Sequence, residues 1–438
     1  MKIQASDRLS SLKPYAFAEI NKRVAALRES GVHAIDFGVG DPSSPTPEFV
    51  IDKLGELGKK HAGTGYPSYV GSADFRKAAC GYMKRRFGVE LDSETEMCSN
   101  IGSKEAIFNF PEAFVNPGDI VICPSPGYPP MKTGTVFAEG TPYFVPLLEK
   151  NGWLVDFESI PADICEKAKV MWINYPNSPT GAIASREYYE KLLEWSRANN
   201  IIIAADEGCY IDIYFDEKPL SILEVGREGV VAFYSMSKRN NMTGYRAGFV
   251  CGDAEIIDIY KRLKTNIDSG TPSIMQEAAI LALADDEHVA EMRDLYARKG
   301  EVIMSALRDI GLEVKKPGAT FYLWVGVGDD LEFMEKLLGV GIVVTPGSMI
   351  SDQCGDINPG KGYVRFALMP TMEDCEEAAK RIRGMGYGGL GPRTYCWLFE
   401  LFDRDRCLQR LWILGATLRG DRSCLFWNAL RCVRRVHG

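Results

Sequence analysis

A lysine at position 238 stands in a run of residues whose types and spacing suit covalent chemistry with an aldehyde. The run reads Ser235-Met-Ser-Lys238-Arg-Asn-Asn-Met-Thr-Gly-Tyr-Arg246-Ala-Gly. A lysine amine can condense with the aldehyde of pyridoxal 5'-phosphate, while Ser235 and Arg246 offer a hydroxyl and a guanidinium to its phosphate. The alternative is an exposed basic turn, because Ser-x-Ser-Lys alone is common. The whole run predicts a pyridoxal phosphate site with Lys238 as its reactive group.

Two further segments could hold other parts of this cofactor. Asn100-Ile-Gly102-Ser103-Lys104 is a turn of small residues before a predicted helix, and free amides at a helix start bind phosphate. Tyr128, within Pro-Gly-Tyr-Pro, is an aromatic residue fixed by a rigid turn, which suits a partner for the pyridine ring. Ordinary packing is the alternative for Tyr128. We expect Gly102, Ser103, Lys104 and Tyr128 to contact the cofactor.

A carboxylate and a guanidinium complete the set. Asp206 follows the apolar run Ile201 to Ala205, so a strand would carry its carboxylate to the sheet edge, where it can pair with a protonated ring nitrogen. A solvated strand end is the alternative for Asp206. Arg365, in the apolar run Tyr-Val-Arg-Phe, needs a partner if buried, and the α-carboxylate of an amino-acid substrate can be that partner.

These residues must be positioned by an α/β architecture. Short β-branched runs alternate with longer amphipathic stretches, which predicts a mostly parallel sheet with ligands at the carboxyl ends of its strands. One helix is expected at 186–199. The predicted strands of the large domain are 120–123, 141–145, 170–173, 201–205, 230–234 and 247–251.

The ends of the chain differ from this central part. Helical spacing predicts a helix over 12–29, followed by a strand at 34–37. A long helix over 274–310 is expected to lead into a smaller α+β domain with strands at 321–325, 342–345 and 363–367. The predicted domains are an N-terminal segment 1–45 that joins the small domain, a large cofactor-binding domain 46–285, a small domain 286–386, and an atypical tail 387–438.

The tail is unusual in composition. Residues 386–438 contain nine arginines, no lysine, four cysteines and three tryptophans, without a clear period. We interpret this segment as foreign to the catalytic fold; a partner-binding appendage is the alternative.

Overall composition narrows the class of protein. A net charge of -8 disfavours nucleic-acid binding, and only four histidines, none paired at ligand spacing, disfavour a metal site. Twelve cysteines without a Cys-x-x-Cys pair suit a reducing compartment. No apolar run approaches eighteen residues, and no signal peptide is recognisable. We therefore predict a soluble cytoplasmic protein without metal, membrane or nucleic-acid partners.

The order of these motifs resembles the class I and II aminotransferases of pyridoxal phosphate fold type I, from about Arg8 to Gly386. The resemblance implies a fold type I transferase that moves an amino group between an amino acid and a 2-oxo acid. It also implies a homodimer with shared active sites, in which Tyr66 reaches the phosphate of the neighbouring subunit. Gly40 would lie near the substrate carboxylate, and Lys238, Asp206 and Tyr210 would have catalytic roles.

Within that class, the segments Gly-Val-Gly-Asp-Pro, Tyr-Pro-Ser-Tyr-Val-Gly and Asn-Tyr-Pro-Asn-Ser-Pro-Thr-Gly are most similar to those of LL-diaminopimelate aminotransferases. The resemblance implies LL-diaminopimelate as donor and 2-oxoglutarate as acceptor. N-succinyl-diaminopimelate, aspartate and alanine remain open as donors. A β-lyase or decarboxylase on the same fold is the alternative reaction, and a non-catalytic ligand-binding relative is disfavoured because Lys238 is present.

Two positions depart from the family pattern. The family has asparagine directly before Pro-Thr-Gly, where this chain has Ser178 with Asn177 one place earlier; it has tyrosine three residues after the aspartate, where this chain has Cys209 with Tyr210 one place later. Both usual residues donate to the phenolic oxygen of the cofactor. Either a local bulge returns Asn177 and Tyr210 to that oxygen, or a different set of residues holds it.

Overall fold

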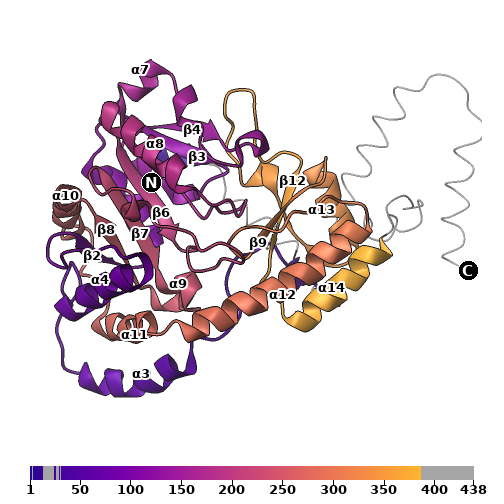
Figure 1. Ribbon diagram of the computed structural model, residues 1–438, viewed down its shortest axis with the longest axis horizontal. Coiled ribbons are helices and arrows are strands. Elements are labelled where there is room, and N and C mark those ends of the chain that lie inside the picture. The colour runs from indigo at the N-terminus through magenta and orange to yellow at the C-terminus, as the bar shows by residue number, and fades with distance from the viewer. Residues whose placement is uncertain (2, 13–23, 26–28, 30, 386–438) are drawn as a thin grey trace, which may run out of the picture. The chain divides into compact units, whose positions relative to one another are not determined.

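A seven-stranded sheet forms the centre of the large domain in this computed structural model (Figure 1). The structure describes residues 1, 3–12, 24–25, 29 and 31–385. The strand order is β2-β8-β7-β6-β5-β3-β4. Strand β8 pairs antiparallel with both β2 and β7 and the other pairs are parallel, so the predicted mostly parallel sheet is confirmed. The strands are β2 Met97–Asn100, β3 Ile120–Ser125, β4 Thr141–Pro146, β5 Ala168–Ile173, β6 Ile202–Gly208, β7 Val230–Ser235 and β8 Gly248–Gly252.

Apolar side chains cover both faces of this sheet, which explains the continuous apolar runs. Along β5, Met171 and Ile173 enter one core cluster, while Val170 and Trp172 enter a second cluster. Successive side chains of a strand point to opposite faces, so each strand contributes to both clusters. The helices of the large domain are α3 Glu48–Lys60, α4 Ala73–Phe87, α5 Ser103–Asn109, α6 Pro129–Phe137, α7 Ala162–Cys165, α8 Arg186–Ala198, α9 Met236–Arg239, α10 Ala254–Lys264 and α11 Ser273–Leu283.

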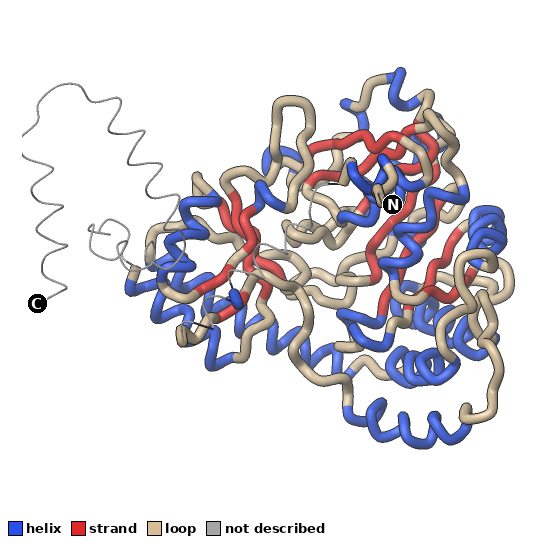
Figure 2. The backbone as a smooth tube through the Cα atoms, turned by 180° about the vertical axis from the view of Figure 1, so that it is seen from behind, coloured by secondary structure: helices blue, strands red, loops and turns tan. Residues whose placement is uncertain are grey.

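The small domain has its own strands and core, and Figure 2 shows its strands as a group apart from the large sheet. Strands β11 Thr345–Pro346, β12 Tyr363–Ala367 and β9 Tyr322–Gly326 form an antiparallel sheet in that order. From the N-terminal segment, β1 Ile35–Asp36 pairs in parallel with β10 Ile342–Val343. The long helix α12 Glu287–Asp309 runs into this domain with α14 Met372–Gly384 beside it, and α13 Asp330–Gly339 completes it (Figure 1).

Some predicted elements were wrong in detail. The single helix expected over 274–310 is two helices, α11 and α12. The break coincides with Asp285 and Asp286. The Asp285 carboxylate accepts a hydrogen bond from the His288 amide, and the Asp286 carboxylate binds Arg239. The strand expected at 342–345 is divided into β10 and β11, which belong to different sheets.

Two predictions cannot be compared with the fold. Most of the helix expected over 12–29 and the tail 387–438 lie outside the described residues. Short helix α1, Asp7–Ser10, precedes that gap. No helix within the described ranges is long and apolar enough to cross a membrane.

The parallel strands bring the predicted site residues to one edge. The strands β3, β6 and β7 run in the same direction, so their carboxyl ends lie on the same side of the sheet. Tyr128 follows β3, Asp206 lies near the end of β6, and Lys238 follows β7. The fold therefore gathers these three residues at the edge where ligands of α/β proteins bind.

Candidate active site

The amine of Lys238 lies where the end of β7 meets the N-terminal segment. Helix α9 begins directly after β7, so Lys238 stands just beyond the carboxyl edge of the sheet. Its Nζ donates a hydrogen bond of 2.6 Å to the Gly40 carbonyl and lies 3.9 Å from Asp41 Oδ1. The side chain is only 17% exposed. Lys238 is thus a shielded amine at the junction of both domains.

Asp206 supplies a buried acceptor. The residue is 3% exposed, and its Oδ1 accepts no hydrogen bond from any residue that the structure describes. Burial raises the pKa of Asp206 to about 7, against a smaller lowering by the Cys209 thiol. Because a buried carboxylate oxygen without a donor is costly, the geometry calls for a donor from a ligand. A protonated ring nitrogen meets that requirement.

The predicted phosphate cradle is assembled around Arg246. Gly102, with φ +72°, packs so closely on the Arg246 guanidinium that a Cβ there would overlap it. Arg246 itself has φ +51°, a left-handed conformation that is uncommon for a side-chain-bearing residue. Its Nη1 lies 3.4 Å from Ser237 Oγ, and the Ser235 hydroxyl accepts from the Ser237 amide at 3.2 Å. Ser103, the first residue of α5, is buried beside this group.

A buried lysine that the sequence analysis missed lies behind this cradle. Lys264 ends α10 and its side chain is fully buried; its Nζ lies 2.7 Å from Asp268 and 3.5 Å from Glu105. Glu105 in turn accepts the Ile101 amide at 3.1 Å, and Asp268 accepts the Gly270 amide at 2.6 Å. Lys264 therefore ties the turn before Gly102 to a second loop. Only the spatial arrangement identifies this lysine, since its sequence context is an ordinary helix end.

The predicted substrate anchor lies in the small domain. Arg365, in β12, is 7% exposed and its Nη2 donates to the Gly38 carbonyl at 2.8 Å. The Tyr322 ring lies under the guanidinium, 4.6 Å from Cζ to the ring centroid. A Cβ at Gly40 would overlap the Tyr322 hydroxyl, so this close approach requires glycine. The structure thus brings Arg365, Gly40 and Lys238 together.

The register of β6 changes where the chain departs from the family pattern. Asp206 pairs with Phe233 and Gly208 with Tyr234, so Glu207 is an extra residue. Beyond this bulge the Tyr210 hydroxyl lies 3.2 Å from the Tyr322 hydroxyl, and the Cys209 Sγ lies 3.4 Å from Ser103 Oγ. Cys209 therefore borders the cradle, whereas Tyr210 contacts the residue that supports the substrate anchor.

Asn177 is buried in its own turn. Its Nδ2 donates to the Asn174 carbonyl at 3.2 Å, and its Oδ1 accepts from the Thr180 hydroxyl at 2.7 Å. Ser178 is half-buried, and its amide donates to Asn174 Oδ1 at 2.8 Å. The polar groups of Asn177 are thus engaged within the segment before Gly181.

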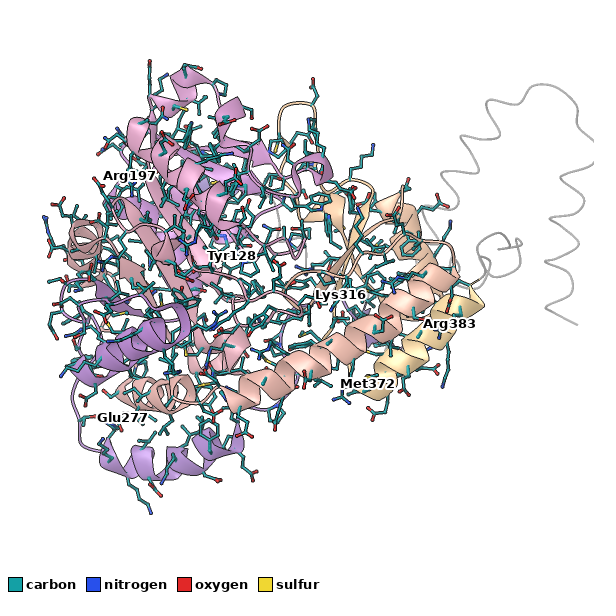
Figure 3. All side chains as sticks on the ribbon, viewed as in Figure 1. Tyr128, Arg197, Glu277, Lys316, Met372 and Arg383 are labelled. Atoms are coloured by element: carbon teal, nitrogen blue, oxygen red, sulfur yellow. The ribbon has the colours of Figure 1, made fainter. Side chains whose placement is uncertain are left out.

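Three further residues are predicted cofactor contacts: Tyr128, Lys104 and Tyr66. Figure 3 labels Tyr128 on the side of the large domain that faces the small-domain strands. Nearby, the Ser125 hydroxyl at the end of β3 donates to the Asp352 carbonyl of the small domain at 2.8 Å. Lys104 is exposed beside Ser103, and Tyr66 is 88% exposed, so neither has a buried place within a single chain.

Comparisons with known proteins show which family this chain resembles. The sequence pattern of the family described as aminotransferase class I and II matches residues 32–382. An LL-diaminopimelate aminotransferase of Aquifex aeolicus is 45% identical over 87% of this chain and 98% of that protein. Among solved structures, BacF of Bacillus subtilis has a TM-score of 0.82 at 32% identity, covering 89% of this chain and all of that one. A probable N-succinyldiaminopimelate aminotransferase of Thermus thermophilus has a TM-score of 0.77 at 31% identity, covering 84% and 100%.

The chain therefore belongs to the class I and II aminotransferases. It is a transaminase that depends on pyridoxal phosphate, and amino acids and 2-oxo acids are its substrates. The residues present fit this cofactor, because Asp206 offers an unpaired buried oxygen and Gly102 leaves room for the Arg246 guanidinium at the phosphate cradle.

Proposed function

We propose that this aminotransferase takes its amino group from LL-diaminopimelate and passes it to 2-oxoglutarate. Support for the donor comes from the LL-diaminopimelate aminotransferases of several bacteria, which are 40% to 45% identical to this chain over at least 86% of its length. The segments that resemble those enzymes include that of Gly40, whose carbonyl accepts a hydrogen bond from Lys238, and that of Tyr66.

The proposed mechanism rests on the positions of Lys238 and Arg365 relative to one backbone segment. Lys238 Nζ binds the carbonyl of Gly40, and Arg365 Nη2 binds the carbonyl of Gly38, two residues away. The amine and the guanidinium are therefore fixed to one short segment of backbone. A substrate whose α-carboxylate binds Arg365 would bring its Cα within reach of Lys238, which is the alignment that proton transfer needs.

Each of the three residues then has one task. Arg365 binds the α-carboxylate of donor and acceptor alike through its two guanidinium nitrogens. Lys238 Nζ would act as general acid and base, moving the proton between the substrate Cα and the cofactor carbon that carries the amino group. Asp206 accepts a hydrogen bond from the ring nitrogen and so keeps that nitrogen protonated. Bound pyridoxal phosphate supplies the carbonyl carbon and the electron-accepting ring.

The other proposed contacts of the cofactor involve its phosphate, its ring and its phenolic oxygen. We assign the phosphate to Gly102, Ser103, Lys104, Ser235 and Arg246, and a face of the ring to Tyr128. Asn177 and Tyr210 remain predicted contacts of the cofactor's phenolic oxygen. In the structure their polar groups bind Asn174, Thr180 and Tyr322.

We further propose a homodimer in which Tyr66 completes the phosphate site of a second copy. Tyr66 is 88% exposed and Tyr69 is 43% exposed, although aromatic residues of this size are commonly covered. The same segment lies against Gly270, in the loop that Lys264 ties to the phosphate cradle. A second copy that covers these tyrosines would explain their exposure in the single chain.

We also propose a cytoplasmic location. All cysteines that the structure describes are free, which suits a reducing compartment. Fractionation of the source cells would test this, with the activity expected in the soluble cytoplasmic fraction.

Replacement of the reactive lysine tests the mechanism. Lys238→Ala should abolish amino transfer, because among the described residues no other amine binds the Gly40 carbonyl, yet cofactor should still bind through its phosphate and ring contacts. Steady-state turnover and the absorbance of bound cofactor measure the two effects separately. Wild-type turnover in Lys238→Ala would show that another group carries the proton, and the mechanism would be wrong.

A further inference from the structure

The arginine directly after Lys238 is buried and binds the link between two helices. Arg239 ends α9, the short helix that carries Lys238, and is 3% exposed. Its Nη1 donates to the Ala282 carbonyl at 2.9 Å and its Nη2 donates to the Asp285 carbonyl at 3.2 Å. The Asp286 carboxylate binds the same Nη2. Arg239 therefore joins α9 to the place where α11 ends and α12 begins.

A buried carboxylate holds the other side of the Arg239 guanidinium. Asp212 is 5% exposed, and its Oδ2 accepts from Arg239 Nε at 2.7 Å and from the Tyr82 hydroxyl at 2.7 Å. Its Oδ1 accepts from Arg86 Nε, also at 2.7 Å. Each nitrogen of Arg239 thus has an acceptor, so the guanidinium cannot turn without breaking hydrogen bonds between charged, buried groups.

The next two residues bind the connections between the domains as well. Asn240 is fully buried, and its Nδ2 lies 2.8 Å from Nε2 of His288, in the first turn of α12. The Asn241 carbonyl accepts from the Thr46 hydroxyl at 2.9 Å. Thr46 lies between β1, which pairs with a strand of the small domain, and α3 of the large domain. The segment after Lys238 is therefore bonded to both of these interdomain connections.

Helix α12 also positions the proposed substrate anchor. Figure 1 shows this helix running from beside α9 and α11 to the strands of the small domain. Ile303 of α12 belongs to the same buried core as Phe366, the neighbour of Arg365 in β12. Contacts thus continue from Lys238 through Arg239 and α12 to the strand of Arg365.

We propose that Arg239 is a positioning residue that fixes α9, and with it the Lys238 amine, to the helix that carries the substrate anchor. The proposal rests on the proposed roles of Lys238 and Arg365 in amino transfer. The contacts with Gly38 and Gly40 hold the tips of those two side chains. Arg239 instead holds the backbone from which the lysine extends, so it determines where the amine stands when the tip is released to react.

Two forms of the cofactor separate placement of the lysine from general damage to the site. Pyridoxal phosphate can form a covalent bond with the Lys238 amine, whereas pyridoxamine phosphate has the same ring and phosphate but no aldehyde. The dissociation constants of apoprotein for both forms would be measured by tryptophan fluorescence. Arg239→Met should raise the value for pyridoxal phosphate at least about tenfold and keep the value for pyridoxamine phosphate within about twofold, because only the first form needs the amine in place.

A conservative variant and a matched control complete the measurement. Arg239→Lys keeps a cation beside Asp212 but replaces the guanidinium by a single ammonium, so its loss should lie between those of Arg239→Met and the wild type. It also provides the test if Arg239→Met does not fold. Arg86→Met removes the other cation from Asp212. Because Arg86 binds Asp212 and the Ile211 and Pro219 carbonyls rather than α9, this variant should keep both dissociation constants within about twofold of the wild type.

Turnover gives a second readout. Arg239→Lys should lower kcat about tenfold and keep KM for the amino donor within about twofold, because Arg365 still binds the substrate while the amine reaches its Cα less well. Equal losses for both cofactor forms in the Arg239 variants, or the same preference for pyridoxal phosphate as in the wild type, would overturn the proposal. A wild type that binds both forms equally would overturn the proposed role of Lys238, and this proposal with it.

Discussion

Tyr322 connects Arg365, the proposed substrate anchor, to Lys238, the proposed reactive amine. Its ring supports the Arg365 guanidinium at 4.6 Å, and its hydroxyl lies 3.2 Å from that of Tyr210. The same hydroxyl packs on Gly40, whose carbonyl holds Lys238. A displacement of the Arg365 guanidinium would therefore also displace the Lys238 amine. The placement of Arg365 is thus as important as its charge.

The role of Arg365 gives a prediction for both substrates. Arg365→Ala should raise KM for donor and 2-oxo acid together, because both present an α-carboxylate to the guanidinium. The loss in kcat/KM should correspond to about 2–5 kcal/mol, as for removal of one partner of a buried charge pair. Arg365→Lys, which keeps the charge but not the two-pronged geometry, should lie between that variant and the wild type. Unchanged KM values for both substrates would mean that another residue anchors the carboxylate.

The candidate site residues could be proposed from the sequence because their chemistry depends on residue type and order. Lys238, Asp206 and Arg365 could be proposed from a lysine motif, a strand end and a charged residue in an apolar run. Tyr322 could not, since an aromatic residue in a strand is usually core. The sequence also left the bulge at Glu207 as one of two alternatives, because nothing in the order Asp-Glu-Gly-Cys-Tyr fixes which residue is extra.

Strands and helices likewise divide into those that the sequence predicted and those that it missed. The β-branched strands of the large sheet were predicted closely, whereas β2 was missed because Met97–Asn100 is short and ends in polar residues. The helix break before α12 was missed because apolar spacing continues across it. Asp285 accepts the His288 amide three residues later, a local capping contact, whereas Asp286 binds Arg239 from a distant part of the sequence, and that second contact has no local signal.

Lys264 provides a prediction at this scale. Lys264→Met removes the cation between Glu105 and Asp268 and leaves two largely buried carboxylates without their charge partner. The free energy of unfolding should fall by about 3–5 kcal/mol, as for other broken buried ion pairs. Cofactor affinity should fall too, because Glu105 orients the Ile101 amide before the cradle. Urea unfolding of apoprotein and cofactor titration measure these effects.

A matched variant on the same helix serves as control. Lys261 lies one turn earlier and binds a backbone carbonyl at the surface, so Lys261→Met should change stability by less than about 1 kcal/mol. The double variant Lys264→Met with Glu105→Gln should recover part of the loss, since it removes one unpaired charge. If both lysine variants behave alike, the buried pair has no special role.

At the scale of the whole molecule, the N-terminal segment joins the parts of the site. Its strand β1 pairs with β10 of the small domain. In the residues that follow, the Gly38 carbonyl accepts a hydrogen bond from Arg365 and the Gly40 carbonyl accepts one from Lys238. The segment before the large domain thus completes a centre whose other residues come from both domains. The proposed dimer would add Tyr66 from a second chain.

Mixed dimers test whether the sites are shared. Lys238→Ala and Tyr66→Ala should each have low activity as separate proteins. If Tyr66 serves the neighbouring site, a hybrid contains one site with both native residues and one with neither, so activity should reappear after subunit exchange. Size-exclusion chromatography with light scattering would confirm the dimer in each sample. Absence of recovered activity in verified hybrids would place Tyr66 in its own subunit's site.

Amino transfer from LL-diaminopimelate to 2-oxoglutarate can be tested by a steady-state comparison of amino donors. The measurement is kcat/KM for LL-diaminopimelate, N-succinyl-diaminopimelate, aspartate and alanine, followed by glutamate formed from 2-oxoglutarate. We predict the highest kcat/KM for LL-diaminopimelate, with one glutamate formed per donor consumed and no turnover without the oxo acid. A higher value for any other donor would contradict the proposed substrate, and turnover that does not need 2-oxoglutarate would contradict amino transfer itself.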